Sequence, residues 1–380
     1  MARLFVTGIG LVTSIGATRE TTWKALLRGD RGIRRIDLFD TSNQRASLGG
    51  QVEVVTIPDI GEGGAAAWSR SSAMAFAAAR EALAEAQIDP KTSKIGLVVG
   101  GTTGGMFETE ARLAELHSDP EAHEALLEML SHPLTATGDR LDEALGPFAR
   151  VRTLASACSS GANALIVAAE WLRAGVVDAV LAGGSDGLCR LTLSGFNALA
   201  AIDGEPCKPF DRSRRGLNLG EGAGFLLLER ASSARDRRAK PIAELAGWAL
   251  RSEAHHITNP EPSGTSAGRT ISAALLRAGL DPSKIDYVNA HGTGTPLNDP
   301  MESAALARSL GAELERIPVS SSKGQIGHTL GAAGAIEAGV AALTIARQAI
   351  VPTAGLVDPD PACPLVHVLG EGRAARVRAT

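Results

Sequence analysis

Residues 151–161 read Val-Arg-Thr-Leu-Ala-Ser-Ala-Cys-Ser-Ser-Gly, and they show how this chain changes from strand to helix. The apolar positions up to Leu154 predict a short apolar strand that ends in a turn of small residues. Apolar side chains then recur on one face of residues 162–172, as an amphipathic helix requires, and Gly175 closes that helix. A strand that turns directly into a helix is typical of α/β folds.

The same order of elements occurs twice along the chain. Residues 72–105 predict an Ala-rich helix, an Asp-Pro pair, a strand and a glycine turn, and residues 266–295 repeat this order. The two Asp-Pro pairs are separated by 281 − 89 = 192 residues, about half of the chain. A second correspondence links residues 154–184 with residues 317–351, each of which reads strand, turn, helix, strand. Chance similarity between two generic helix–strand units is the alternative interpretation.

We therefore predict an α/β protein with two pseudo-symmetric halves, in which helices cover mixed or parallel sheets. The charged stretch at residues 230–240 marks the break between an N-terminal half, 1–235, and a C-terminal half, 236–380. Strands that end in glycine turns and lead into helices place a ligand site at the carboxyl ends of the strands.

Composition limits the classes of protein to which this chain can belong. Lys and Arg number 38 and Asp and Glu number 42, so a net charge of −4 provides no field that attracts nucleic acid. A hydrophobic content of 44% with 21% charged residues is typical of a folded globular chain and excludes disorder. No uninterrupted apolar stretch is long enough to cross a bilayer, so we expect no membrane span.

The cysteines and the first residues indicate the cellular compartment. The four cysteines lack C-x-x-C spacing and no H-E-x-x-H motif occurs, so we expect no metal site. Scattered cysteines of this kind are typical of reduced cytosolic thiols. Residues 1–17 superficially resemble a signal peptide, but Gly8 and Gly10 interrupt the apolar run, and we interpret it as a first strand. We expect a cytoplasmic protein.

Cys158 has the setting expected of a catalytic thiol. It lies at the turn into a helix, where free N–H groups and the helix dipole stabilise a thiolate and lower its pKa. The same N–H groups suit the oxyanion that forms when a thioester is attacked. A small buried cysteine without chemistry is the alternative, and we assign that role to Cys189, Cys207 and Cys363.

His291 and His328 are the candidate partners of this thiol, because each lies where a strand ends in a glycine turn. Each histidine taken alone is as well explained by a structural role. Glu337 stands in an otherwise apolar helix, where a carboxylate needs a buried partner, and Lys323 is the candidate for that partner.

Several further motifs have simpler explanations than catalysis. Asp299 and Glu302 occupy the N-cap and N3 positions of a predicted capping box. The residues around Ser185 match the G-x-S-x-G motif of hydrolases, but residues 188–191 do not predict the helix that must follow a nucleophilic serine. The dinucleotide fingerprint fails because Thr13 stands where its third glycine belongs, and no phosphate-binding P-loop occurs.

Taken together, five stretches resemble those of the β-ketoacyl-acyl-carrier-protein synthases, the elongating condensing enzymes of the thiolase superfamily. They are residues 6–10, 156–161, 216–224, 287–299 and 320–337, and they cover most of the chain in the family's order. The resemblance implies the thiolase-like αβαβα layered fold, with two pseudo-symmetric halves and mixed sheets. It also implies an acyltransferase that joins an acyl-enzyme thioester to malonyl-ACP by decarboxylative Claisen condensation, extending a fatty-acid or polyketide chain.

The resemblance assigns catalytic roles to the residues already singled out. Cys158 matches the nucleophile that receives the acyl chain. His291 and His328 match the pair that promotes decarboxylation of the malonyl thioester and stabilises the enolate. Lys323 and Glu337 match a supporting pair that orders the second histidine. A pair of histidines also distinguishes this sequence from degradative thiolases and from starter-type synthases.

Binding residues and partners follow from the same resemblance. Thr293 and Thr295 match hydroxyls that bind the phosphopantetheine arm, and Asp299 and Glu302 match structural acids near the site. No cofactor is expected, because the substrates arrive on the phosphopantetheine of acyl carrier protein. The family implies a homodimer, with a heterodimer of related subunits as the alternative.

Two features of the sequence leave alternatives open. Family members end with a strand pair whose G-F-G-G-type loop completes the oxyanion hole, whereas this sequence stops at Thr380. We interpret it as a truncated form, and the alternative is a protein that lacks this central strand and one oxyanion donor. A non-catalytic or chain-length-controlling partner subunit of a heterodimeric ketosynthase is the alternative function, although such subunits lack the nucleophilic cysteine. Candidate contacts to an acidic carrier protein, with solvated charges as the alternative, are Arg70, Arg212, Arg214 and Arg215.

Overall fold

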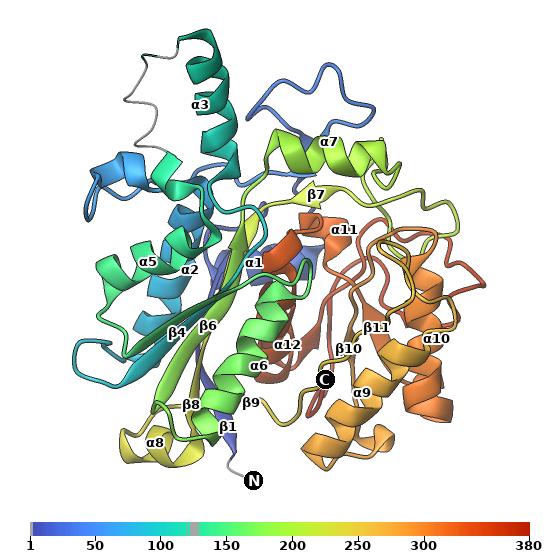
Figure 1. Cartoon of the computed structure of the whole chain (residues 1–380). Helices are drawn as coiled ribbons and strands as arrows, with labels where there is room; N and C mark the ends of the chain where they lie inside the picture. The colour runs from blue at the N-terminus through green and yellow to red at the C-terminus, as the bar shows by residue number, and fades with distance from the viewer. Residues whose placement is uncertain (1–2, 120, 122–128) are drawn as a thin grey trace.

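The computed structural model describes residues 3–119, 121 and 129–380. Its largest sheet has six strands in the order β5-β4-β6-β8-β1-β9 (Figure 1). Strands β4, β5 and β6 run parallel, whereas β8 is antiparallel to both β6 and β1, so the sheet is mixed. The bounds are β1 Leu4–Val12, β4 Ile95–Gly100, β5 Arg150–Leu154, β6 Ala179–Asp186, β8 Gly222–Arg230 and β9 Ala243–Glu244.

Helices cover both faces of this sheet because its strands are apolar at consecutive positions. In β6, Val180 and Ala182 belong to the core formed with α6 (Ser160–Arg173) and α12 (Ala333–Arg347). Leu181, between them, belongs to the core formed with α2 (Arg70–Ala86). Since neighbouring residues of a strand point to opposite faces, a continuous apolar run is stable only between two helical layers.

Glycines in β1 set the distance between the sheet and α2. A Cβ atom on Gly8 would lie 2.0 Å from the carbonyl oxygen of Ala82, and one on Gly10 would lie 1.8 Å from that of Ala78. Only glycine permits this approach, so the glycines that interrupt the apolar N-terminal run serve helix–strand packing.

The second half forms a smaller, parallel sheet in the order β10-β11-β13. These strands span Val288–Asn289, Pro318–Ser320 and Val366–His367, and helices α9 (Thr265–Ala278) and α10 (Asn298–Leu310) pack against them. Helices α6 and α12 contact each other and lie between the two sheets (Figure 1). The layers therefore run α2, large sheet, α6 with α12, small sheet, α9 with α10.

The structure differs from the predicted repeat in the second half. The strand expected within residues 266–295 is reduced to Val288–Asn289. The second sheet is parallel, which is one of the two arrangements predicted. The strand after α12, β12 (Ala349–Ile350), pairs antiparallel with β14 (Arg373–Ala374) and does not join β10, as its counterpart β6 joins β4. Residues 243–244, in the expected second half, extend the first sheet as β9.

The remaining described elements complete the chain between those already named. They are α1 Arg19–Arg28, β2 Ile33–Arg35, β3 Leu48–Gly50, η1 Gly64–Ala67, α3 Met106–Ser118, η2 Met129–Ser131, α5 Leu134–Leu145, α7 Arg190–Ala198, β7 Leu219–Gly220, α8 Ala231–Asp236, η3 Pro282–Lys284, η4 Gly311–Glu315, α11 Lys323–Ile326 and η5 Leu330–Ala332.

One helical segment of the described chain, Leu330–Arg347, is long and apolar enough by composition to cross a membrane. In the structure, 61% of this segment is buried, and α12 packs against α6 and the large sheet. The core helix of a folded domain passes the same test of length and composition, so this segment is weak evidence for a membrane span.

Candidate active site

Cys158 lies in the turn between β5 and α6. The residue before it, Ala157, has a left-handed backbone with φ of 52°. The Ser160 hydroxyl stabilises this strained turn, because it accepts from Ser156 N at 2.9 Å and donates to Ala157 O at 2.7 Å. A Cβ atom on Gly161 would lie 2.9 Å from Ala335 N, so glycine lets the start of α6 approach α12. The predicted strand–turn–helix therefore presents the thiol between the two central helices.

The predicted lowering of the Cys158 pKa is wrong. Burial is the largest influence and raises the pKa of this thiol, and the carboxylates of Glu337 and Asp186 raise it further. Lys323 acts in the opposite direction, but it does not reverse the shift. A helix N-terminus stabilises a thiolate only where burial does not outweigh it, so the resting group is a thiol.

His328 is the immediate partner of this thiol. Its Nε2 lies 3.0 Å from Cys158 Sγ, and its Nδ1 accepts a hydrogen bond from Leu330 N at 3.2 Å. Because a backbone N–H can only donate, the neutral ring carries its proton on Nε2, facing the sulfur. Burial, followed by the charge of Lys323, holds the pKa of His328 well below its usual value. The ring is therefore a neutral hydrogen-bond donor to the thiol.

His291 lies beside His328, with ring centroids 5.1 Å apart in an edge-on arrangement. Lys323 Nζ lies 3.1 Å from His291 Nδ1 and 2.7 Å from His291 O, and it also forms an ion pair with Glu337. The ammonium can only donate, so His291 Nδ1 accepts and its Nε2 carries the proton. Burial, followed by the charge of Lys323, holds the pKa of His291 well below its usual value.

The structure corrects the expected target of the Lys323–Glu337 pair. The pair was expected to order the second histidine, but Lys323 contacts the first, His291. The second histidine, His328, is oriented by the backbone N–H of Leu330 instead. Lys323 is 1% exposed, and burial raises the pKa of the Glu337 carboxyl against the opposing influence of the ammonium.

Asp299 and Glu302 lie near the site, but they do not form the predicted capping box. Helix α10 begins at Asn298, and its N-cap residue is Leu297, so neither carboxylate caps it. Glu302 instead accepts from His291 N and Gly292 N, both at 2.7 Å. Burial raises the pKa of Glu302 to about 7. The local preference for a cap gives way because the buried amides of the histidine loop need acceptors.

Thr293 and Thr295 follow directly in the same loop. Their hydroxyl oxygens lie 2.9 Å apart, and Thr295 Oγ1 also accepts from Asn298 N at 3.2 Å. Thr293 is buried and Thr295 half-buried. The loop thus joins the catalytic candidate His291 to a pair of hydroxyls.

Ser185 is not placed as a nucleophile. It lies within β6, is buried, and donates to Ser71 O at 2.7 Å and Gly222 O at 3.3 Å. Helix α7 does begin soon after it, at Arg190, although the sequence did not predict this helix. The next residue, Asp186, is fully buried and accepts from Gly331 N at 2.6 Å. The G-x-S-x-G motif therefore contains a buried acid, Asp186, whose hydrogen bond from Gly331 N holds the loop that follows His328.

Sequence reasoning missed the internal role of two arginines. Arg70 pairs with buried Glu221 at 2.6 Å, and Arg214 pairs with Asp299 and Asp360, so neither lies free on the surface. Of the four arginines proposed as carrier-protein contacts, Arg212 and Arg215 remain exposed. A buried carboxylate at Asp299 needs a cation, and that need was the signal in the sequence that could have pointed to Arg214.

A cleft of about 1010 Å³ lies behind this constellation, between α9 and α12. Its walls are mostly apolar, with Ile271, Leu275 and Ile345 among them, and Glu302 and Glu337 lie at the side nearest the histidines. Among residues 3–119, 121 and 129–380, no group of three or more His, Cys, Asp or Glu side chains is arranged to hold a metal ion.

Known proteins that are similar to this chain match it over nearly its whole length. The sequence model for the N-terminal domain of β-ketoacyl synthases matches residues 1–234, and the model for the C-terminal domain matches residues 242–357. The 3-oxoacyl-[acyl-carrier-protein] synthase 2 of Staphylococcus aureus is 34% identical over 382 residues, covering 98% of this chain and 92% of the relative. The protein of the same name from Synechocystis is also 34% identical, with the same coverage.

Solved structures show the same relationship. The ishigamide ketosynthase/chain length factor superposes with a TM-score of 0.91 at 31% identity, covering 99% of this chain and 94% of that one. A type II polyketide ketosynthase in complex with its acyl-carrier protein gives 0.88 at 29% identity, with the same coverage. These similarities confirm the thiolase-like layered α/β fold. The chain belongs to the β-ketoacyl synthase family.

Proposed function

We propose that this chain is a β-ketoacyl-ACP synthase that joins an acyl group held on Cys158 to malonyl-ACP by decarboxylative Claisen condensation. The observation that carries the proposal is the 3.0 Å contact between His328 Nε2 and Cys158 Sγ, with His291 directly beside it. Leu330 N donates a hydrogen bond to Nδ1 of His328, and Lys323 Nζ donates one to Nδ1 of His291. Each neutral imidazole is thereby left with one N–H to offer a thioester.

In the first half-reaction, the Cys158 sulfur attacks the carbonyl carbon of acyl-ACP. A new C–S bond forms, the bond to the pantetheine sulfur breaks, and the thiol proton leaves with that departing sulfur. Because burial raises the Cys158 pKa, a preformed thiolate is scarce, and the N–H of His328 stabilises negative charge as it develops on sulfur.

In the second half-reaction, malonyl-ACP loses carbon dioxide and leaves an enolate. The N–H groups of His291 and His328 stabilise its oxygen, since neutral imidazoles donate without having to lose a charge. The enolate carbon attacks the acyl-enzyme carbonyl, the C–S bond to Cys158 breaks, and its sulfur takes up one proton. The products are β-ketoacyl-ACP, carbon dioxide and the free thiol.

We infer that acyl carrier protein delivers both thioesters. The type II polyketide ketosynthase similar to this chain is in complex with such a protein, and the 3-oxoacyl synthases are named for it. The ishigamide protein is a ketosynthase/chain length factor, which supports a related partner subunit as the alternative assembly. Retention of Cys158 favours the catalytic role for this chain over the chain-length-controlling one.

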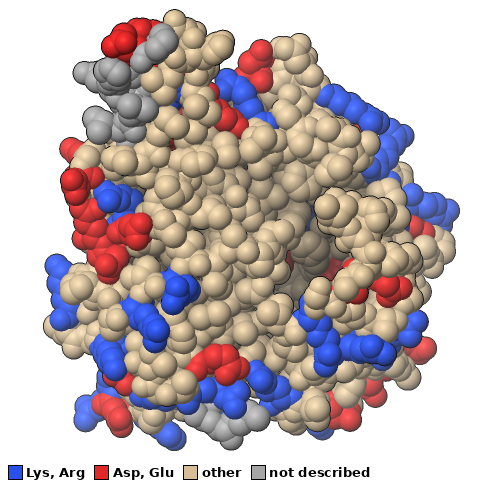
Figure 2. All heavy atoms as spheres, viewed as in Figure 1, with Lys and Arg blue, Asp and Glu red and all other residues tan. Residues whose placement is uncertain are grey.

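We propose that two copies pair through β5 to form a homodimer. Strand β5 stands at the edge of the large sheet, where it pairs only with β4 among the described strands and has exposed or half-exposed side chains throughout. Figure 2 shows that the middle of this face, around the first turns of α6, carries no charged side chains. Strand β5 itself exposes Arg150 and Arg152, so the uncharged part of this face lies beside it, at the first turns of α6. An unpaired strand edge next to an uncharged area favours association around a twofold axis.

We also propose that the enzyme works in the cytoplasm without a resident cofactor. The scattered thiols support the compartment, and the pantetheine arm that arrives with each substrate supplies the thioester chemistry. Neither half-reaction as written requires a metal ion or a redox group.

Intact-mass spectrometry after mixing with an acyl-ACP tests the proposal. We expect the wild type to gain the mass of one acyl group, and Cys158→Ala to gain none. Adding malonyl-ACP should then discharge the adduct and release one carbon dioxide for each β-ketoacyl-ACP formed.

Two matched variants separate this reaction from other acylations. Cys189→Ala removes a buried thiol outside the site, and Ser185→Ala removes the hydrolase-like serine, so both should keep the adduct. Failure of the wild type to gain an acyl group, or an adduct that survives in Cys158→Ala, overturns the proposal.

A further inference from the structure

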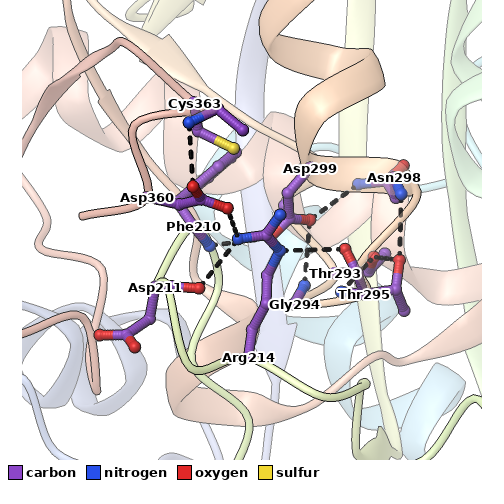
Figure 3. Close-up of polar contacts among 12 residues, drawn as sticks. Phe210, Asp211, Arg214, Thr293, Gly294, Thr295, Asn298, Asp299, Asp360 and Cys363 are labelled. Carbon is purple, nitrogen blue, oxygen red and sulfur yellow. Dashed lines mark hydrogen bonds and ion pairs between the residues drawn. The ribbon is translucent and has the colours of Figure 1, made fainter. Parts of the chain in front are cut away.

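Arg214 joins three separate segments beside the two threonine hydroxyls (Figure 3). Its Nε donates to Thr295 O at 3.2 Å, and its Nη1 donates to Asp360 Oδ2 at 2.5 Å and to Asp211 O at 2.9 Å. The guanidinium therefore ties its own loop to two stretches of the second half, one of which carries the threonines.

The cluster around Arg214 is buried to an extent unusual for charged groups. The Arg214 side chain is 6% exposed, and that of Asp299, whose Oδ2 lies 3.6 Å from Arg214 Nε, is 0% exposed. Buried charges of opposite sign are stable only when their remaining donors and acceptors are also satisfied. Here Asp299 also accepts from Gly294 N at 3.1 Å and Phe210 N at 2.7 Å.

These contacts hold the threonine loop from both of its sides. Arg214 fixes the carbonyl of Thr295, and Asp299 fixes the N–H of Gly294, the residue between the two threonines. Gly294 has φ of 80°, a left-handed conformation that places both hydroxyls on the same side, 2.9 Å apart. No hydrogen bond from Arg214 to either hydroxyl is present in the described structure, so it acts on them through the backbone.

We propose that Arg214 is a positioning residue that orients the hydroxyls of Thr293 and Thr295 toward the pantetheine arm of the thioester substrate. The inference rests on the proposed function, because it assigns the hydroxyl pair to that arm. Arginine suits the role better than lysine, since its planar fork reaches acceptors on three segments at fixed angles. A lysine ammonium keeps the charge next to Asp299, but it cannot hold the same set of acceptors.

The test compares two acyl donors that differ only in the arm. One is an acyl-ACP, and the other is the thiophenyl ester of the same acyl group, which is reactive but has no pantetheine. The rate of acyl transfer to Cys158 is followed by intact mass, and kcat/KM is obtained for each donor. If kcat/KM falls only with acyl-ACP, the variant affects recognition of the pantetheine arm. If kcat/KM falls with both donors, the variant affects the fold or the thiol.

We expect Arg214→Gln to lower kcat/KM for acyl-ACP about tenfold or more, through a higher KM, as for the loss of a charged hydrogen bond. With the thiophenyl ester, we expect a change of no more than about twofold, because Cys158 and His328 are untouched. Arg214→Lys should recover only part of the loss. Adding Thr295→Ala to Arg214→Gln should lower kcat/KM for acyl-ACP by a smaller factor than Thr295→Ala does in the wild type. The reason is that Arg214→Gln has already misplaced the Thr295 hydroxyl.

Further variants keep the test decisive if Arg214→Gln folds poorly. Asp360→Asn weakens only the outermost contact of Arg214, at a 19% exposed carboxylate, and should show a smaller loss with the same dependence on donor. Arg237→Gln removes a partly buried arginine that pairs with Glu229 near α8, and it serves as the matched control without dependence on donor.

The outcomes distinguish the inference from the function on which it rests. If the wild type accepts acyl groups from neither donor, the proposed function is wrong and the assignment to Arg214 falls with it. If the wild type accepts both and Arg214→Gln lowers both equally, the proposed function stands and the positioning role is refuted. Strict additivity of Arg214→Gln and Thr295→Ala would refute it as well.

Discussion

Replacing Lys323 with methionine tests whether one buried ammonium sets the state of His291. Methionine keeps most of the side-chain length and removes the contacts to His291 Nδ1, to His291 O and to Glu337. Removing one partner of a buried ion pair destabilises a protein by about 3–5 kcal/mol. Because the Glu337 side chain is 17% exposed, we expect the lower end of that range, about 3 kcal/mol.

The effect on catalysis should be confined to one half-reaction. Without the ammonium, no donor holds the proton of His291 on Nε2, and loss of a positioned imidazole lowers a rate by about 10²–10⁴-fold. Acyl transfer depends on the contact between His328 and Cys158, which Lys323 does not touch, so we expect it to fall by less than about tenfold. The assay measures carbon dioxide release from malonyl-ACP beside acyl transfer to the thiol.

The pH profile provides a second readout. The charge of Lys323 lowers the pKa of both histidines, so its removal should let both values rise. A raised pKa means that the neutral ring is lost earlier as the pH falls. Carbon dioxide release by Lys323→Met should therefore decline at a higher pH than in the wild type.

The double variant Lys323→Met with Glu337→Leu separates stability from chemistry. It removes the unpaired carboxylate, so the urea midpoint should recover, whereas carbon dioxide release should stay low. Carbon dioxide release by Lys323→Met within about threefold of the wild type would refute the reasoning, because one lost hydrogen bond to a charged group should exceed that change.

Three further results are expected. His328→Ala should slow acyl transfer to Cys158 by about 10²-fold or more, measured by intact mass, and an unchanged rate would show that the ring does not assist the thiol. Iodoacetamide labelling of Cys158 should be slow at neutral pH and rise only above the ordinary thiol range, because burial raises its pKa; a midpoint below neutral pH would contradict this. Gly10→Ala should destabilise the fold by about 1–3 kcal/mol in urea unfolding, since its Cβ would meet an α2 carbonyl. Gly195→Ala, in α7 with nothing within 4 Å of the new Cβ, is the control and should be neutral or stabilising.

The elements that the sequence predicted well are those whose signal is local and long. Helix α2 is the Ala-rich helix predicted at the start of residues 72–105, and it was readable because its alanines repeat with helical period over four turns. Strand β5, the turn at Cys158 and helix α6 also lie where the pattern placed them. In such segments, the hydrogen bonds and the repeat of apolar side chains are set mostly by residues that are close along the chain.

Predictions failed where distant segments compete for the same groups. The motif at Asp299 and Glu302 has the spacing of a capping box, but the buried amides of His291 and Gly292 take the Glu302 carboxylate. The helix dipole at Cys158 favours a thiolate, but burial between α6 and α12 outweighs it. Spacing along the chain contains no information about which of these demands is stronger.

Residue types, their order and the duplicated pattern of strands, turns and helices were thus readable from the amino acids, because period and turn chemistry act over neighbouring residues. The sequence also singled out Cys158, His291 and His328 as chemistry-bearing groups at turns. Only the folded chain decided that Lys323 serves His291, that Leu330 N orients His328 and that Arg214 reaches Thr295. Hydrogen bonds select tautomers and loop conformations over a few ångströms, and residues so close in space are here often far apart along the chain.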